Sequence, residues 1–215
     1  MSAKLLAEGL GTLILVMCGI GTGIMGMGLA GGTLALTLFA NAFATGLILY
    51  LLITIFGPLS GAHMNPAVTL YMLLTRQIGA AMAGAYVLVQ VTGALLAVPL
   101  THAMFAQDLF QLATTARSGV GLYLSEFVAT FGLCLTIAGA TRHTPAQTPA
   151  LVGAWIAAAF WFTGSASFAN PAVTLARVFS DTFTGIAATN VPAYVVAQLV
   201  AAILAAILLP RLFSR

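Results

Sequence analysis

The segment Ser60–Leu70 reads SGAHMNPAVTL, and 105 positions later the segment Ser165–Leu175 reads SASFANPAVTL. Both copies contain the hexapeptide Asn-Pro-Ala-Val-Thr-Leu, an identity that chance rarely produces in a chain of 215 residues. Pro suits the first turn of a helix, where its missing N–H needs no partner, and Asn suits the N-cap before it. Each copy therefore predicts a short helix, which begins at Asn65 in the first copy and at Asn170 in the second.

The composition indicates a membrane protein. Hydrophobic residues make up 61% of the chain and charged residues 5%, with a mean hydropathy of +1.09, whereas soluble domains carry roughly 25% charged residues. A net charge of +3 from seven cations is too small to indicate a nucleic-acid partner. The two Cys lie within apolar stretches and the three His are scattered, so neither a disulfide framework nor a metal or cofactor site is predicted.

Five apolar stretches are long enough to span a bilayer, which needs about 20 residues. A sixth candidate is short, and by length alone it resembles a buried or re-entrant segment more than a span. The five long stretches are Leu5–Leu29, Leu34–Phe56, Ile78–Met104, Val120–Ala140 and Val191–Leu209, and the short one is Ala150–Thr163.

The similarity between the two halves extends beyond the hexapeptide and makes the short stretch a span. Each half has Glu in its first span and Tyr and Gln in its third. Three spans per half is an odd number, so the second half enters the bilayer from the opposite side, as in inverted repeats. The chain divides into a first repeat 1–105 with a half-helix at 65–75, a polar linker 106–118, and a second repeat 119–215 with a half-helix at 170–180.

The residues before each half-helix are expected to line a pore. Non-helical backbone at membrane depth is tolerated only where it is buried in protein or lines a water-filled cavity. The carbonyl groups of these segments would then accept hydrogen bonds, the two Asn amides would donate them, and the half-helix N-termini would repel cations and protons. The expected ladder of carbonyls comes from Gly61, Ala62, His63 and Met64 in the first repeat and from Ala166, Ser167, Phe168 and Ala169 in the second.

These features resemble the aquaporin (major intrinsic protein) family over nearly the whole chain. The resemblance implies an all-α membrane protein with six transmembrane helices and two re-entrant half-helices in an inverted 3+3 repeat. It also implies a homotetramer in which each protomer conducts water or small neutral solutes passively and without a cofactor. The residues that carry it are Asn65-Pro66-Ala67, Asn170-Pro171-Ala172, Glu8 and Glu126.

The outer constriction departs from the family's usual pattern. Most members have Arg directly after the second Asn-Pro-Ala, where this chain has Val173. The family's spacing places the other constriction residues at Thr45, at Ala158 or a neighbour, and at Ser167. Small residues at these positions imply a wide, weakly polar opening, similar to the bacterial aquaglyceroporin-like branch that passes glycerol and neutral trihydroxy metalloids such as arsenous acid.

Four further side chains have competing interpretations. Arg177 lies one turn beyond Val173, so it either reaches the pore or compensates the half-helix dipole with Asp181 as partner. Glu8 and Glu126 either relay protons or hold the pore-lining backbone, and the structural role is favoured because a relay needs further acids. For His63 a structural role is favoured over a gate or a metal ligand.

Charge placement predicts that both termini are cytoplasmic in a multi-pass cell-membrane protein, the inner membrane if the source is bacterial. A secondary transporter is the main alternative because inverted repeats also mark that class, but four acidic residues leave little to bind a coupling ion. An ion channel lacks a ring of charged residues, and no catalytic set supports an enzyme. The cations expected inside are Lys4, Arg76, Arg142, Arg211 and Arg215, against Arg117 and Arg177 outside.

Overall fold

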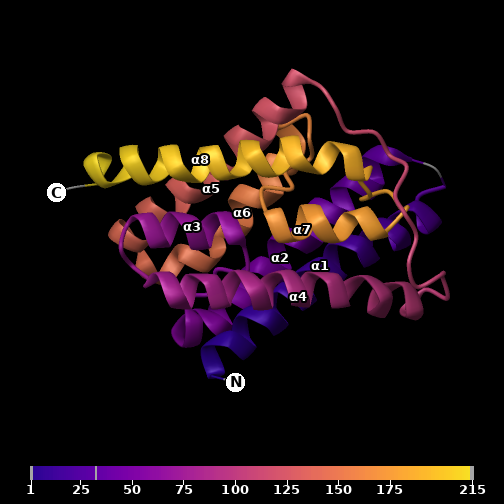
Figure 1. Cartoon of the computed structure of the whole chain (residues 1–215). Coiled ribbons are helices and arrows are strands. Elements are labelled where there is room, and N and C mark those ends of the chain that lie inside the picture. Colours follow the sequence, from indigo (N-terminus) through magenta and orange to yellow (C-terminus); the bar gives the residue numbers. More distant parts are fainter. Residues whose placement is uncertain (1, 32, 214–215) are drawn as a thin grey trace.

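A computed structural model of the chain describes residues 2–31 and 33–213, which fold into a bundle of helices (Figure 1). Eight α-helices and three short 3-10 turns are present in the described residues. The helices are α1 Ala3–Leu29, α2 Leu34–Ser60, α3 Pro66–Leu74, α4 Ala80–Met104, α5 Val120–His143, α6 Thr148–Phe162, α7 Pro171–Ala176 and α8 Val191–Leu212; the turns are η1 Pro145–Gln147, η2 Arg177–Phe179 and η3 Ala188–Asn190.

Five of these helices, α1, α2, α4, α5 and α8, are long and apolar enough to cross a membrane. Helix α6 has 15 residues, which gives a length of about 22 Å against a hydrocarbon core of about 30 Å. It contacts both α2 and α5 and follows the turn η1 directly. The sixth span is therefore a short helix that packs against α2 and α5.

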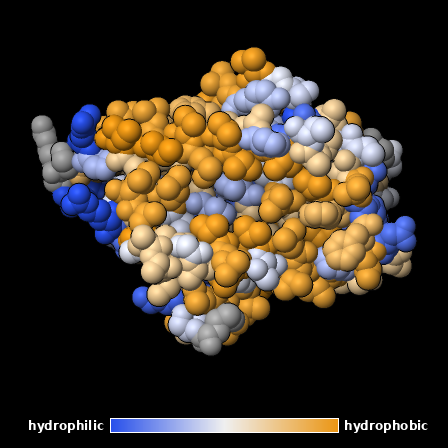
Figure 2. Space-filling view, viewed as in Figure 1, coloured by the Kyte–Doolittle hydropathy of each residue, from blue (hydrophilic) through white to orange (hydrophobic). Residues whose placement is uncertain are grey.

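The surface has the character expected of a chain in lipid. Figure 2 shows a broad hydrophobic band across the middle of the visible face, with hydrophilic residues gathered toward both ends. Large apolar side chains such as Leu88, Leu124 and Val196 are well exposed. Such exposure is unfavourable in water but favourable against lipid chains.

The half-helices α3 and α7 meet near the middle of the bundle, between α4 and α8 (Figure 1). Each begins at the Pro of the repeated hexapeptide, with the preceding Asn as its N-cap. The first ends at Leu74, while the second has only six α-helical residues and continues as the turn η2. Because both start near the middle of the bundle and run outward, their N-termini face each other.

Two pairs of glycines bring long helices into close contact. A Cβ atom built on Gly93 of α4 would lie only 2.3 Å from the carbonyl oxygen of Gly9 in α1. A Cβ atom on Gly153 of α6 would lie 2.5 Å from the carbonyl oxygen of Gly46 in α2. Small residues at membrane helix contacts allow this approach, and here they fix the walls around the half-helices.

Candidate functional site

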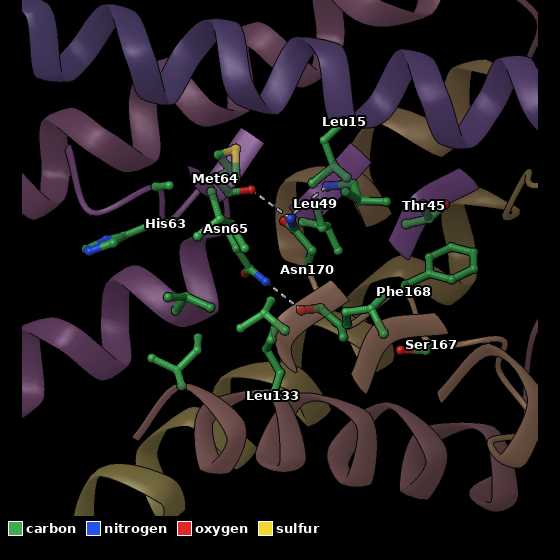
Figure 3. A pocket seen from close by; sticks show the side chains of 18 of the residues that line it. Leu15, Thr45, Leu49, His63, Met64, Asn65, Leu133, Ser167, Phe168 and Asn170 are labelled. Carbon is green, nitrogen blue, oxygen red and sulfur yellow. Dashed lines mark hydrogen bonds between the residues drawn. The ribbon is translucent and has the colours of Figure 1, made fainter. Parts of the chain in front are cut away.

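The two asparagines of the hexapeptides link the halves of the molecule. Asn65 Oδ1 accepts a hydrogen bond from the N–H of Ala67 at 2.9 Å, and its Nδ2 donates to the carbonyl of Ala169 in the other half at 2.7 Å. Asn170 likewise caps its own helix through Ala172 N–H at 3.0 Å and donates to the carbonyl of Met64 at 2.8 Å. Figure 3 shows both crossing bonds as dashed lines.

Each asparagine keeps one donor free for a solute. A side-chain amide has two N–H groups, and one of them is used in the crossing bond to Ala169 or Met64. Among the described residues no second acceptor is recorded for either Nδ2. Asn65 and Asn170 both line the central cavity, so the remaining N–H groups are available where the half-helices meet.

The segments before the half-helices have the same unusual backbone in both repeats. Three positions in each segment have positive φ, and most of these residues are not glycine, which costs about 1–2 kcal/mol each. Such angles persist only where the surroundings impose them. The equivalent pairs are Gly61 (88°) and Ala166 (57°), Ala62 (48°) and Ser167 (50°), and Met64 (46°) and Ala169 (48°).

Glu8 holds the first of these segments in place. Its carboxylate accepts hydrogen bonds from the backbone N–H of His63 at 2.9 Å and of Met64 at 2.6 Å. It also accepts from Ser60 Oγ at 2.6 Å and from Gln90 Nε2 at 2.8 Å. A fully buried carboxylate is tolerated when its oxygens are met by donors in this way.

Glu126 does the same for the second segment. It accepts from the backbone N–H of Phe168 at 2.9 Å and of Ala169 at 2.8 Å, and from Gln198 Nε2 at 2.6 Å. Neither carboxylate is among the residues that line the cavity. This geometry is that of a structural anchor, because a proton relay needs groups that reach the water path.

Replacing Glu8 by Leu should destabilise the protein far more than replacing it by Gln. Leu leaves the N–H groups of His63 and Met64 without acceptors, at about 1–3 kcal/mol each, whereas Gln keeps an acceptor oxygen in place. Thermal unfolding of the purified variants in detergent checks this. A Leu variant that unfolds at the same temperature as the Gln variant would contradict the anchoring role.

A cavity of about 130 Å³ lies between the helices and is lined by both asparagines. Its walls include apolar residues from the long helices α1, α2 and α5 and from the short helix α6, and polar residues of the two segments. Of the side chains and segments expected at the pore, those that line it are Thr45, Gly61, Ala62, His63, Met64, Asn65, Ser167, Phe168, Ala169, Asn170, Val173 and Arg177.

The prediction that Ala158 lines the constriction is wrong. Ala158 is exposed on the outer face of α6, and the residues of this helix that line the cavity are Thr148, Val152, Ile156 and Phe160. Phe160 is bulky where a small residue was expected. This part of the cavity wall therefore carries a larger side chain than the sequence implied. Ala166 also differs from expectation, because it packs against the apolar core and does not line the cavity.

The Pro and Ala of each hexapeptide lie behind the pore wall. Pro66 and Pro171 occupy the first helical position, and all four residues are buried. Ala67 belongs to an apolar cluster with residues of α5 and α8, and Ala172 to one with residues of α1 and α4. Their small size lets the half-helices pack closely, so their role is structural.

Arg177 reaches the cavity. It is 5% exposed, and its guanidinium lies over the ring of Phe168 at 4.2 Å from the centroid. A Cβ atom on Gly19 of α1 would be 3.1 Å from Arg177 Nη2, so this glycine makes room for the guanidinium. Asp181 is not its partner, because Asp181 Oδ1 accepts from the backbone N–H and the hydroxyl of Thr114. In the described part of the chain, no ion pair or side-chain hydrogen bond of Arg177 is recorded.

Three hydroxyl groups on the cavity wall, those of Thr45, Thr148 and Ser167, have no partner in the described residues. Thr45 Oγ1 and Ser167 Oγ are both buried and unpaired, and their residues are 6% and 3% exposed. In Figure 3 they lie with Phe168 on one side of the asparagine pair, while His63 lies on the other. Buried polar atoms normally find a partner, so a solute that offers hydroxyl groups would satisfy them.

Two of the histidines make structural contacts, and the sequence indicated this role only for His63. His63 packs edge-on against Tyr86, and its Nδ1 lies 3.1 Å from Thr69 Oγ1, which fits a structural residue. His102 lies near the end of the third span, and its sequence neighbours give no sign of a partner. It is fully buried, with Nε2 at 2.9 Å from Ser180 Oγ and Nδ1 at 3.0 Å from the carbonyl of Leu109. It ties the linker to the segment after α7.

Comparison with known proteins agrees with this geometry. A model of the family described as major intrinsic protein matches residues 1–165. Aquaglyceroporin AqpS of Rhizobium meliloti (strain 1021) is 46% identical over 205 residues, 95% of this chain and 88% of that protein. Nodulin-26 of Glycine max is 32% identical over 138 residues, 63% of this chain and 50% of its own length. The X-ray structure of the aquaglyceroporin from Plasmodium falciparum matches with a TM-score of 0.74 at 19% identity, over 99% of this chain and 95% of that one.

Proposed function

The chain belongs to the major intrinsic protein family and is a passive membrane channel for water and small neutral solutes, and we propose that it passes glycerol-sized molecules with several hydroxyl groups. The observation that carries this proposal is the pair of unpaired, buried hydroxyls of Thr45 and Ser167 on the cavity wall. As a channel, the protein is not an enzyme.

The cavity wall matches the two faces of such a solute. Apolar side chains such as Leu15, Leu49 and Leu133 form one part of the lining, and they suit the C–H groups of a polyol. The hydroxyl groups of the polyol need hydrogen-bond partners. Thr45 and Ser167 supply them, together with the free amide N–H groups of the two asparagines and the carbonyls of the two segments before the half-helices. A ladder of such contacts replaces the hydration shell step by step.

The selectivity filter of this proposal differs from the family's usual one. Thr45, Phe160, Ser167, Val173 and Arg177 all line the cavity. Val173 supplies neither charge nor donors at the family's arginine position, whereas Arg177 brings up to five donors from one turn further along. We propose that Arg177 takes over the positive charge of the filter while Val173 keeps the opening apolar.

The most similar relative reported above is called an aquaglyceroporin, which supports glycerol as a solute. Arsenous acid is a neutral molecule with three hydroxyl groups, so it presents the same groups to Thr45, Ser167 and the asparagine amides as glycerol does. We therefore propose neutral metalloid hydroxides as further solutes, alongside some water.

The placement in the membrane is also a proposal. If both termini are cytoplasmic, Lys4, Arg76 and Arg142 lie on the cytoplasmic side and Arg117 lies on the opposite side, as the positive-inside rule requires. Arg215, which is also expected on the cytoplasmic side, is not among the residues that the structure describes. The family resemblance supports a homotetramer with one pore per protomer, in the cell membrane.

Val173→Arg should lower glycerol permeability of proteoliposomes far more than water permeability. A side chain of this size in the constriction changes the barrier for the larger solute by about 1–3 kcal/mol, or about 10- to 200-fold. Stopped-flow light scattering measures both rates on the same vesicles. An unchanged ratio of glycerol to water permeability, or a wild-type channel that admits water and excludes glycerol, would contradict the proposed substrate class.

A further inference from the structure

A second cavity lies beside one end of the pore, at the C-terminal ends of α3, α5 and α8. It has a volume of about 670 Å³. Arg76 and Gln77 line it from the segment after α3, Arg142 from the last turn of α5, and Phe213 from the end of α8. Thr141 lines both this cavity and the pore. The site is therefore adjacent to the pore mouth but separate from the filter.

Within the described residues, no acidic side chain pairs with the positive charge of this cavity. Arg76 and Arg142 are exposed, and for neither is an ion pair or a side-chain hydrogen bond recorded in residues 2–31 and 33–213. Of the chain's four acids, Glu8 and Glu126 are engaged by the pore segments, and the other two lie elsewhere. Asp108 and Asp181 line a separate pocket beside the 106–118 linker.

The wall of the cavity is amphipathic. Leu74, Leu209 and Pro210 supply an apolar side next to the two guanidinium groups. In Figure 2 hydrophilic residues gather at the end of the molecule where α8 ends in Figure 1, beside the hydrophobic band. A ligand that fits has an anionic head and an apolar tail.

We propose that this cavity binds the phosphate group of an anionic phospholipid. A guanidinium presents paired N–H groups that match phosphate oxygens, and two of them without acidic partners attract an anion. At the edge of the hydrophobic band, lipid phosphate is the anion at the highest local concentration. Basic pockets between membrane helices bind such headgroups, and the apolar wall here accommodates the start of an acyl chain.

The test compares lipid binding by native mass spectrometry and by thermal stability in a neutral detergent. Phosphatidylglycerol should bind and raise the unfolding temperature of the wild type more than phosphatidylcholine does. Arg76→Gln and Arg142→Gln should each weaken phosphatidylglycerol binding by about fivefold, the effect of one cation near an anionic headgroup. Lys4→Gln, an exposed cation outside the cavity, is the matched control and should bind as the wild type does.

Two results would overturn the proposal. Equal loss of phosphatidylglycerol binding in Lys4→Gln and in the two Arg variants would show a diffuse attraction of the whole charged end. Stabilisation by inorganic phosphate equal to that by phosphatidylglycerol would assign the cavity to a free anion and not to a lipid. Restored binding in Arg76→Lys or Arg142→Lys, which keep the charge, would support the site and separate it from a folding defect.

Discussion

Asn65→Ala should reduce the permeability of the channel to glycerol and water by about tenfold or more. The substitution removes the N-cap of α3, the crossing bond to the carbonyl of Ala169 and the free donor on the cavity wall. A buried polar group that is left without a partner costs about 1–3 kcal/mol. Each 1.4 kcal/mol added to the barrier for permeation lowers the rate about tenfold. Asn170→Ala should have a similar effect, because it bonds to Met64 in the same way.

Asn65→Ser separates conduction from folding. A serine hydroxyl still caps the helix but is too short to carry the amide N–H groups to the pore. We expect Asn65→Ser to unfold close to the wild-type temperature and still conduct slowly. Stopped-flow permeability of proteoliposomes, normalised to the amount of folded protein, gives the comparison. Undiminished flux in both Ala variants would contradict the role of the amides.

Arg177→Leu should let cations leak through a channel that otherwise excludes them. In a partly wet site two unit charges about 4 Å apart repel by about 4 kcal/mol, so the leak can rise by up to about a thousandfold. The half-helix dipoles remain and keep part of the barrier. Potassium and proton fluxes, followed with fluorescent dyes in proteoliposomes, measure the change. Arg177→Lys keeps the charge and should leak much less.

Two further variants test where in the pore the positive charge must lie to exclude cations. Adding Val173→Arg to Arg177→Leu moves the arginine to the family's usual position and should restore cation exclusion. Gly19→Ala places a methyl group 3.1 Å from Arg177 Nη2 and should reproduce part of the Arg177→Leu leak. Gly28→Ala on the same helix, where an added Cβ meets nothing within 4 Å, is the control. A tight channel in Arg177→Leu would show that cation exclusion does not depend on Arg177.

The half-helices could be predicted from the sequence because their causes are local. Asn at the N-cap and Pro at the first position specify where each helix starts, and the repeat shows that the pattern is not accidental. The partners of Glu8 could also be inferred. A buried carboxylate in the first span needs donors, and the non-helical segment before α3 has backbone N–H groups that no helical hydrogen bond uses and that donate to Glu8.

The sequence placed Ala158 on the wrong face of α6 because the residue pattern of this helix does not distinguish its faces. Its residues are apolar on every side, so the sequence does not show which face meets the pore. The helix is also short, and it starts after a 3-10 turn, which shifts the rotation of later residues. The contact of Gly153 with Gly46 of α2 sets that rotation, and neither residue signals it in the sequence.

Arg177 and His102 depend on partners that are distant in the chain. The direction of Arg177 is fixed by the ring of Phe168 and by the space above Gly19 in α1. His102 is buried because Ser180 and Leu109 meet it from two other segments. Such tertiary contacts override what spacing along one helix predicts.

The most direct test of passive conduction is glycerol movement in proteoliposomes with and without ion gradients. Vesicles that contain the wild-type protein are exposed to a glycerol gradient, first with sodium and proton gradients in place and then after ionophores have collapsed them. The pore between Asn65 and Asn170 predicts the same rate in both conditions and equal final concentrations inside and outside. Glycerol that accumulates against its gradient, or uptake that stops when the ion gradients collapse, would contradict a passive channel and indicate a coupled transporter.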